Sequence, residues 1–477
     1  MQSDLKYFFY PSSVAIIGAS EDPLKIGGLV FRNVISGYKG KVFPINPKHN
    51  MLNGYKVYRS ILDVPDEVDL AIVVIPAAGV LSAIEEACKK KVKASIIITS
   101  GFAETGEQGR KLQEQVITRA KSCGMRVIGP NSFGIVSTAV DLNATFGVGI
   151  RRKGSTAFIS QSGAIADGTF DWFQDEGIGF SILVNLGNRG DVNEAEIIRF
   201  LKEDETTNTI GIYLEGLPNG LGREFLKAVE ETISEKPIVV LKSGRSSSGA
   251  RGAMSHTGSL AGSYNIYKTA IQQHHAFVVE SMQDLIDYIR ALSMQKNRTT
   301  NSEIRGIGIL SNSGGLGILA ADEAEKVGFN VPMLPQNVID EIRKIIPPYG
   351  APYNPIDVTA QGTPKQQYEF YSKTFKVLEE HNVVDGYVVI IEGSFPRETV
   401  EAITDAIINE IVPITKKPIV VNWYAAKSII EDLAKKIENE KVPVYPTPER
   451  AIHGLQALIN YSLARKKAQI KALISQS

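Results

Sequence analysis

The 477-residue chain has few cysteines and no excess of charge of either sign. Its two cysteines, Cys88 and Cys123, are too few for a disulfide framework or a four-ligand metal site, and we expect both to be structural thiols in a reducing cytoplasm. Lys+Arg and Asp+Glu are both 52, so no global field attracts nucleic acid or an anionic membrane. No apolar run approaches the ~18 residues of a membrane span. The composition therefore predicts a soluble, cytoplasmic protein that binds neither nucleic acid nor membrane.

Apolar residues make up 43% of the chain, enough for about three domains with buried cores. In the first 130 residues, short β-branched runs alternate with segments of helical spacing. The runs are 14–17, 41–45, 70–75, 94–99 and 126–128. This alternation predicts an α/β domain over residues 1–130 with a parallel, doubly wound Rossmann-like sheet, which binds its ligand at the carboxyl ends of the strands.

The rest of the chain contains an internal duplication. Segment 158–163 (FISQSG) is echoed by 309–314 (ILSNSG), and three further pairs follow in the same order. These pairs are 210–216 with 386–393, 236–240 with 417–421, and 277–292 with 442–458. Four ordered matches predict two homologous flavodoxin-like α/β domains, at 131–295 and 303–464.

One segment has no counterpart in the second copy. Residues 243–262 are rich in glycine and serine, and we expect a flexible loop there. The loop carries His256, one of six histidines, and an imidazole can accept and release a phosphoryl group near neutral pH. Glu215 follows the strand predicted at 210–214 and is the best carboxylate for holding the other ring nitrogen. Its duplicate Glu392 shows that the scaffold alone can place a glutamate there.

The first strand leads into a glycine-rich turn at 18–28 that opens a helix, and such a turn presents free N–H groups to a phosphate. Its spacing is not the dinucleotide fingerprint. The second strand ends near Asn46 and Lys48, where an NAD site needs an acidic residue, so a phosphorylated ribose fits better and an oxidoreductase is disfavoured. The alternative is a turn whose glycines only permit tight packing.

The duplicated turns at 160–163 and 311–314 each end a predicted strand and start a helix. One such turn taken alone is best explained as an N-cap. Two at equivalent positions favour a shared phosphate site between two helix N-termini.

With these motifs in place, the chain resembles the α subunits of the ADP-forming acyl-CoA (acetate–CoA) synthetases of archaea, in the succinyl-CoA synthetase superfamily. The resemblance covers residues 5–462, and its most specific motif is the phosphohistidine segment 254–262 (MSHTGSLAG). It implies that His256 is phosphorylated and that Glu215 is its partner. The implied coenzyme A residues are Gly18, Ala19, Ser20, Lys25, Gly27, Pro44, Asn46, Ile75, Pro76, Ser100, Gly101 and Asn131. The implied phosphate-binding residues are Ser160, Gln161, Ser162, Gly163, Ser311, Ser313, Gly314 and Gly315.

The resemblance also implies an acid–thiol ligase that interconverts acyl-CoA, ADP and phosphate with acid, CoA and ATP. All of the sequence is assigned to the CoA domain and the twin domains, so the ATP-grasp domain that binds ADP/ATP and Mg²⁺ is expected on a separate β subunit, as an α2β2 heterotetramer. No metal site is expected in this chain. Acetate and other short or branched acids are the family's usual substrates, and aryl acids are used by relatives. The alternative is a CoA-binding regulatory or scaffold protein without ligase activity, which the intact His256 motif disfavours.

Overall fold

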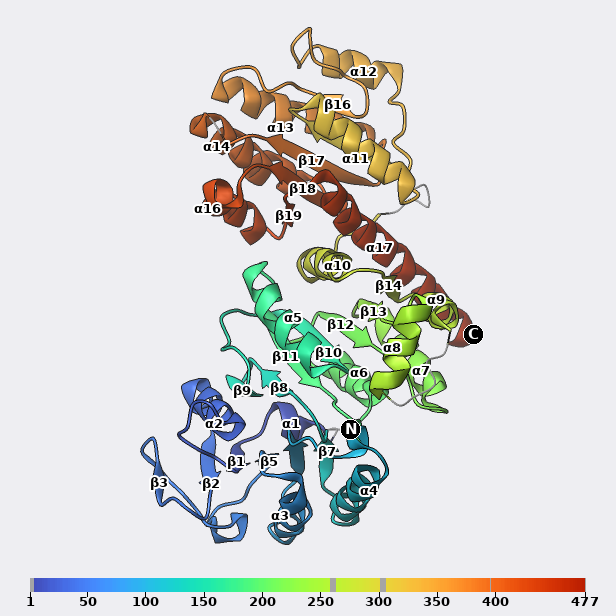
Figure 1. Ribbon diagram of the computed structural model, residues 1–477. Coiled ribbons are helices and arrows are strands. Elements are labelled where there is room, and N and C mark those ends of the chain that lie inside the picture. The colour runs from blue at the N-terminus through green and yellow to red at the C-terminus, as the bar shows by residue number, and fades with distance from the viewer. Residues whose placement is uncertain (1–3, 258–262, 301–305, 395, 477) are drawn as a thin grey trace. The chain divides into compact units, whose positions relative to one another are not determined.

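The computed structural model describes residues 4–257, 263–300, 306–394 and 396–476 (Figure 1). The chain forms two compact units, Met1–Glu280 and Ser281–Ser477. Three large sheets organise them, two in the first unit and one in the second. None of the helices in those ranges combines the length and hydropathy that a membrane crossing needs.

The first sheet is entirely parallel, in the order β2-β1-β5-β6-β7. Its strands are β1 (Ser13–Ile17), β2 (Lys41–Ile45), β5 (Leu70–Val73), β6 (Ala94–Ile97) and β7 (Arg126–Ile128), with helices α2 (Ile26–Gly37), α3 (Ala77–Lys89) and α4 (Glu107–Ser122). The central strands are buried throughout because both faces of a parallel sheet are covered. The strand order reverses direction between β1 and β5, which is where a doubly wound sheet binds its ligand.

Helices α3 and α4 are joined by a disulfide between Cys88 and Cys123. The prediction of two structural thiols is therefore wrong. The two helices pack so that the cysteine Cα atoms lie 5.7 Å apart, within disulfide range, although 35 residues separate them in sequence. The argument from free thiols to a reducing compartment loses its support.

The second sheet has the order β14-β13-β12-β10-β11-β8-β9. Its parallel strands are β10 (Lys153–Ser160), β11 (Phe180–Asn185), β12 (Thr209–Leu214), β13 (Ile238–Lys242) and β14 (Phe277–Val279), and the hairpin β8 (Gly134–Ser137) and β9 (Leu142–Thr145) is added at one edge. The helices are α5 (Gly163–Asp175), α6 (Glu194–Glu203), α7 (Leu221–Ile233) and α9 (Tyr264–Gln273). Strands β11-β10-β12-β13-β14 have the flavodoxin order 2-1-3-4-5, as predicted.

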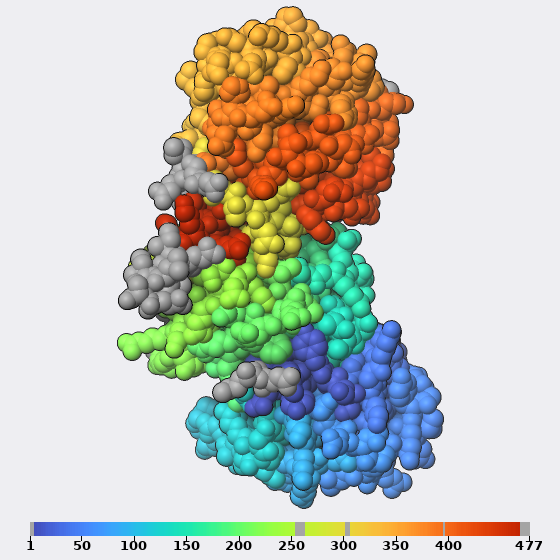
Figure 2. Space-filling view, turned by 180° about the vertical axis from the view of Figure 1, so that it is seen from behind, coloured from blue at the N-terminus to red at the C-terminus, as the bar shows by residue number. Residues whose placement is uncertain are grey.

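The two sheets of the first unit are packed together by contacts distant in sequence. The Nδ2 atom of Asn33 on α2 donates to the carbonyl oxygens of Thr145 and Gly147, both at 2.9 Å. The N-terminal helix α1 (Lys6–Phe9) contributes Phe9, whose ring stacks on Phe200 of α6 with centroids 4.9 Å apart. Figure 2 shows the dark blue N-terminal segment next to a green segment of the same unit. The first unit therefore holds both sheets in one body.

The segment after β13 is not the open loop that its composition suggests. Residues Ser247–Thr257 form helix α8, and the hydroxyl of Ser246 accepts a hydrogen bond from the Gly249 N–H at 3.1 Å. The alanines, arginine and methionine of the segment favour a helix and outweigh its two glycines. Among the described glycines of this segment, Gly244, with φ 80°, is the one that keeps a conformation favouring glycine. The loop prediction is wrong for 247–257, and residues 258–262 lie outside the described residues.

The second unit contains the other copy of the duplication, in the order β16-β15-β17-β18-β19. Its strands are β15 (Ile307–Ser311), β16 (Ile356–Asp357), β17 (Gly386–Glu392), β18 (Ile419–Tyr424) and β19 (Val444–Tyr445). Its main helices are α10 (Met282–Gln295), α11 (Gly314–Lys326), α12 (Gln336–Arg343), α13 (Pro364–His381), α14 (Arg397–Ala406), α16 (Lys427–Asn439) and α17 (Pro448–Gln476). The order is again 2-1-3-4-5, so the predicted fold class, a Rossmann-like domain followed by two flavodoxin-like domains, is confirmed.

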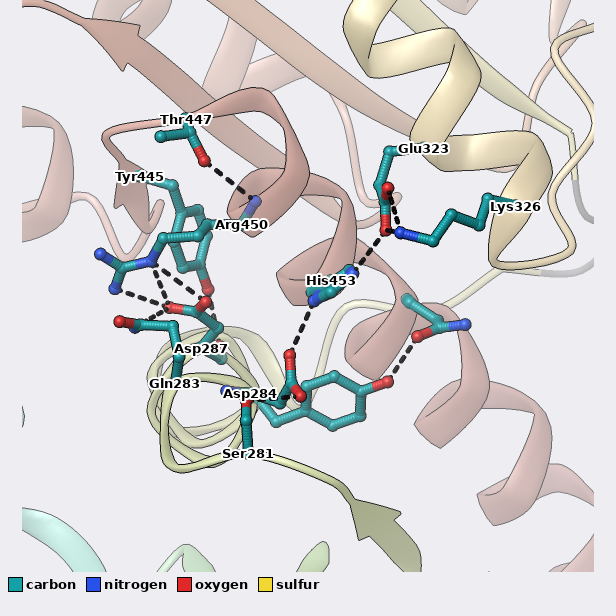
Figure 3. A network of polar contacts seen from close by, with 12 residues as sticks. Ser281, Gln283, Asp284, Asp287, Glu323, Lys326, Tyr445, Thr447, Arg450 and His453 are labelled. Carbon is teal, nitrogen blue, oxygen red and sulfur yellow. Dashed lines mark hydrogen bonds and ion pairs between the residues drawn. The ribbon is translucent and has the colours of Figure 1, made fainter.

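A charged network joins α10, α11 and α17 of the second unit (Figure 3). The Nδ1 atom of His453 lies 2.9 Å from the Asp284 carboxylate, and its Nε2 atom lies 2.9 Å from the Glu323 carboxylate. Both ring nitrogens face carboxylate acceptors, and only the protonated ring, an imidazolium, can donate from both nitrogens at once. The hydrogen bond that His453 donates to the Asp284 carboxylate raises the pKa of His453 above its usual value, and the bond to Glu323 adds to this rise against the effect of burial.

This network predicts that the second unit loses stability as the pH rises. Because the pKa of His453 is higher in the folded than in the unfolded state, protonation of this ring adds to the free energy of unfolding. This contribution is complete below about pH 6.5 and is lost as the pH rises through the folded-state pKa. We expect wild type to lose stability over that interval relative to His453→Gln, measured by chemical unfolding of the full chain. His381→Gln, which removes a more exposed contact with Glu341 at 3.1 Å, is the control. An identical pH profile for wild type and His453→Gln would contradict the prediction.

Candidate functional site

The first predicted turn is built by close packing at the point where the sheet order reverses. Gly18 has φ 100°, and a Cβ atom there would lie 2.7 Å from the Val74 carbonyl oxygen. A Cβ atom on Gly27 would lie 2.1 Å from the Gly18 carbonyl oxygen. The Nδ2 atom of Asn46 donates to the Ala19 carbonyl at 2.8 Å, so this side chain holds the turn in place. No side chain caps α2. The Gly28 N–H donates to the Lys25 carbonyl at 2.9 Å, and the N–H groups of Ile26 and Gly27 before it have no acceptor among the described residues.

The turns that follow β5, β6 and β7 are tied to one another. The Asn131 N–H donates to the Thr99 carbonyl at 2.8 Å, and the Thr99 hydroxyl donates to the Ile75 carbonyl at 2.7 Å. Asn131 itself has a left-handed φ of 58°. These bonds bring three of the predicted coenzyme A segments to one edge of the sheet.

A cavity of about 1210 Å³ opens at this edge and continues to the second sheet of the same unit. The sequence-predicted residues that line it are Ile75, Pro76, Ser100, Asn131, Gln161, Ser162, Gly163 and Glu215. Among the described residues, Gly18, Ala19, Ser20, Lys25, Gly27, Pro44, Asn46, Gly101 and Ser160 do not line it. The cavity thus joins part of the predicted coenzyme A site to the start of α5 and to Glu215.

The start of α5 is ordered by its own serines. The Ser160 hydroxyl donates to the Ser162 carbonyl at 2.7 Å, and the Ser162 hydroxyl caps the helix by accepting from the Ile165 N–H at 3.3 Å. Ser160 therefore shapes the turn from behind, whereas Ser162 and Gly163 line the cavity.

Glu215 is buried at the end of β12, and its backbone is fixed from two sides. The Gln161 Oε1 atom accepts from the N–H groups of Glu215 and Gly216, at 2.6 and 3.1 Å. The Lys242 ammonium donates to the Glu215 carbonyl at 2.9 Å. Burial lowers the pKa of Lys242, although the Glu215 charge opposes this shift. This arrangement holds the predicted partner of the histidine rigidly at the cavity wall.

A charged pair that the sequence did not predict lies beside Glu215. Arg189 lies in the turn after β11, and its Nη1 atom donates to the Glu194 carboxylate at 3.1 Å and to the Gly216 carbonyl at 2.8 Å. Gln161 Nε2 donates to the same Glu194 oxygen. The available signal was the polar, glycine-rich turn 187–190 at the carboxyl end of a strand.

Two aromatic rings and a carboxyl group form another part of the cavity wall. Phe133 and Phe146 pack edge to face with centroids 4.9 Å apart. Burial, followed by the neighbouring Asp171, raises the pKa of the Asp167 carboxyl on α5. The cavity therefore has an apolar part next to the helix start, and these residues were also missed from sequence.

The second unit repeats the serine turn at the start of α11, with a carboxylate beside it in place of an amide. The Ser311 hydroxyl donates to the Ser313 carbonyl at 2.8 Å, matching the bond of Ser160. In strand register Asp357 stands opposite Ser311, where Asn185 stands opposite Ser160 in the first copy. A Cβ atom on Gly314 would lie 2.9 Å from the Asp357 carboxylate, so a negative charge lies beside the start of α11. The residues Ser311, Ser313, Gly314 and Gly315 are thus brought together at this helix start.

His256 lies in α8, which follows β13 in the first unit. Its side chain lies outside the described residues, so its predicted role stays a prediction. The strand that leads to α8 ends at Lys242, the residue that donates to Glu215.

Three family models match consecutive parts of the chain. They are the CoA binding domain at residues 12–138, the succinyl-CoA ligase like flavodoxin domain at 153–292 and the Ligase-CoA domain at 307–471. The order of these matches agrees with the order of the three sheets.

Whole-chain relatives point the same way. The α subunit of acetate–CoA ligase (ADP-forming) I from Pyrococcus furiosus is 38% identical, over 98% of this chain and 100% of that protein. Acetate–CoA ligase (ADP-forming) I from Archaeoglobus fulgidus is 33% identical over 98% of this chain, which spans 65% of that protein. Among solved structures, the dinucleotide forming acetyl-coenzyme A synthetase 1 of Ca. Korarchaeum cryptofilum, in complex with phosphate and ADP, has a TM-score of 0.89 and 37% identity over 98% of both chains. The chain belongs to the family of the ADP-forming acetate–CoA ligase α subunits, in the succinyl-CoA synthetase superfamily.

Proposed function

We propose that this chain is the α subunit of an acid–thiol ligase that converts acyl-CoA, ADP and phosphate into free acid, CoA and ATP, and catalyses the reverse reaction. The observation that carries the proposal is the cavity that runs from the turns of the first sheet to the start of α5 and Glu215. A thioester held by those turns would lie next to a helix N-terminus that attracts phosphate.

In this proposal the first sheet binds coenzyme A. The open N–H groups of α2 and the turn at Gly18 receive the phosphates of the nucleotide end, with Lys25, Gly27, Pro44 and Asn46 around it. The pantetheine arm follows Ile75, Pro76, Ser100 and Asn131 into the cavity. The acyl group then faces the rings of Phe133 and Phe146, an apolar surface suited to short aliphatic acids.

The chemistry proceeds in two transfers. A phosphate oxygen attacks the thioester carbonyl and the carbon–sulfur bond breaks. CoA leaves as its thiolate, and the acyl group remains as an acyl phosphate. The N–H groups at the start of α5 stabilise the charge that develops in this step. A ring nitrogen of His256 then attacks the phosphorus, the bond to the acyl oxygen breaks, and the carboxylate leaves. Glu215 holds the other ring nitrogen and stabilises the cation that forms.

ATP formation needs a nucleotide site, which we place on a separate ATP-grasp β subunit in an α2β2 assembly. This division is supported by the Pyrococcus relative, a named α subunit of matching length, and by the Archaeoglobus ligase, of which this chain spans 65%. Mg²⁺ bound with the nucleotide on that subunit would neutralise phosphate charge. Gly244, with its left-handed backbone before α8, is suited to serve as a hinge when phosphohistidine moves to the partner.

We also propose that the work is divided among three domains, at 1–130, 131–295 and 303–464. The first binds coenzyme A, the second carries His256 and Glu215, and the third carries the duplicated serine-glycine turn at 311–315. The family matches and the three sheets support this division.

The proposal is tested by measuring ATP formed from acyl-CoA, ADP and phosphate. We expect none from the purified chain and steady turnover once a β subunit of the ATP-grasp type is added. Acetyl, branched-chain and aryl CoA esters should be assayed in parallel. ATP formation by the chain alone would contradict the division of labour, and no turnover of any ester with the partner present would contradict the ligase assignment.

A further inference from the structure

Arg189 occupies a turn that is fixed to both halves of the cavity. Gly187 and Gly190, which lie on either side of Arg189 in the same turn, pack against the turn after β7. There the Gly190 N–H donates to the Gly129 carbonyl at 3.0 Å. A Cβ atom on Gly187 would lie 2.3 Å from the Pro130 carbonyl oxygen. Arg189 has a left-handed φ of 54°, a conformation that a long side chain keeps only where its surroundings impose it.

The guanidinium group of Arg189 is only partly used by the protein. Its Nη1 atom is bound by Glu194 and by the Gly216 carbonyl, and its side chain is 11% exposed. Its Nε and Nη2 atoms have no acceptor among the described residues, although Arg189 lines the cavity. A guanidinium held at one corner with its other donors open is well placed to bind an oxyanion.

Charge makes this position stand out. Of the described residues that line the cavity, Arg189 is the sole cation, whereas Glu104, Asp167 and Glu215 are carboxylic acids. A phosphate dianion that enters such a cavity meets repulsion unless a cation offsets it. The helix start of α5 supplies only partial charges to do so.

We propose that Arg189 binds the phosphoryl group at the start of α5, both as inorganic phosphate and as acyl phosphate. This inference rests on the proposed function and adds a phosphate-binding residue to it. Glu194 and Gln161 act as positioning residues that aim the guanidinium, because both contact the Arg189–Gly216 corner.

The second copy of the fold provides an internal contrast. There Asp357 stands where Asn185 stands in the first copy, and its carboxylate lies beside Gly314 at the start of α11. The Asp357 carboxylate supplies a negative charge to the N-terminus of α11, where an anionic ligand would otherwise bind. The free chain should therefore bind one phosphate, in the first unit.

Equilibrium dialysis of the full chain against labelled inorganic phosphate tests the inference. We expect one saturable site, and Arg189→Gln should weaken its affinity about 10- to 100-fold, the value of a lost hydrogen bond to a charged group. Arg189→Lys keeps the charge without the fork and should lose less. Arg199→Gln, which removes an exposed ion pair with Glu231 on the neighbouring helix, should bind as wild type does.

Two further variants separate phosphate binding from a structural role. Glu194→Gln, which weakens the hold on the guanidinium, should lose less affinity than Arg189→Gln, and the double variant Arg189→Gln/Glu194→Gln should remain as weak as Arg189→Gln. No saturable binding by wild type, equal affinity in Arg189→Gln, or recovery in the double variant would overturn the inference. Labelling of the chain by acetyl phosphate is measured alongside, and phosphate binding without any labelling would contradict the proposed function and leave the assignment of Arg189 standing.

Discussion

Replacing His256 by alanine is expected to abolish ATP formation by the assembled enzyme, lowering kcat by about 10⁴-fold or more. In the proposed mechanism the imidazole carries the phosphoryl group between two active sites, and none of the described residues that line the cavity is a second histidine that could replace it. Acyl phosphate formation from acyl-CoA and phosphate should survive in this variant, because that step uses the cavity and the start of α5. The measurement is steady-state ATP formation together with trapping of the acyl phosphate as a hydroxamate.

His274→Ala is the matched control for this variant. His274 lies at the end of α9 in the same unit, and its Nδ1 atom contacts the Ala270 carbonyl at 2.8 Å, away from the cavity-lining residues. We expect its kcat to stay close to wild type. ATP formation by His256→Ala at a tenth of the wild-type rate or above would refute the phosphohistidine route.

Glu215→Gln is expected to lower kcat about 10²- to 10⁴-fold with little change in KM for acyl-CoA. Glutamine keeps the size of the side chain but removes the charge that stabilises the histidine cation. The backbone of residue 215 should stay in place, because Gln161 and Lys242 bind its N–H and carbonyl groups. The loss therefore reports on the carboxylate rather than on folding.

The duplication supplies the control for Glu215. Glu392 ends β17 at the equivalent register, because Ser311 pairs with Ile390 as Ser160 pairs with Tyr213. Its N–H donates to Asn312 Oδ1 at 2.7 Å, as that of Glu215 does to Gln161. Glu392→Gln makes the same chemical change on the same scaffold, and we expect wild-type kcat. Equal losses in the two variants, or none in Glu215→Gln, would refute the assigned role.

The fold could be predicted from the sequence because its signals are local. Runs such as 14–17 and 70–75 are continuously apolar and rich in β-branched residues, as is typical of strands buried on both faces, and the paired segments 158–163 and 309–314 mark the duplication. Two features of the fold could not be predicted from the sequence, for different reasons. Helix α8 forms in a segment whose glycine and serine content suggests a loop, and the Cys88–Cys123 disulfide depends on how two helices pack.

The same distinction applies to the site. Gln161, Ser162 and Gly163 follow a strand directly, so their motif predicted a place at the cavity, and they line it. Arg189 and Glu194 reach the site because β11 and β12 flank β10 in the folded sheet. This strand order brings residues 189, 194 and 216 to Gln161. No local pattern encodes that meeting. Asp357 likewise gains significance only from its register opposite Ser311.

The most direct test follows one phosphoryl group through a single turnover. The chain is labelled with acetyl [³²P]phosphate, freed of reagent, and mixed with ADP and Mg²⁺, with and without the β subunit. The account predicts an acid-labile, base-stable label on wild type that passes to ATP only when the β subunit is present, and no label on His256→Ala. Label that persists in His256→Ala, or that never reaches ATP with the partner present, would contradict it.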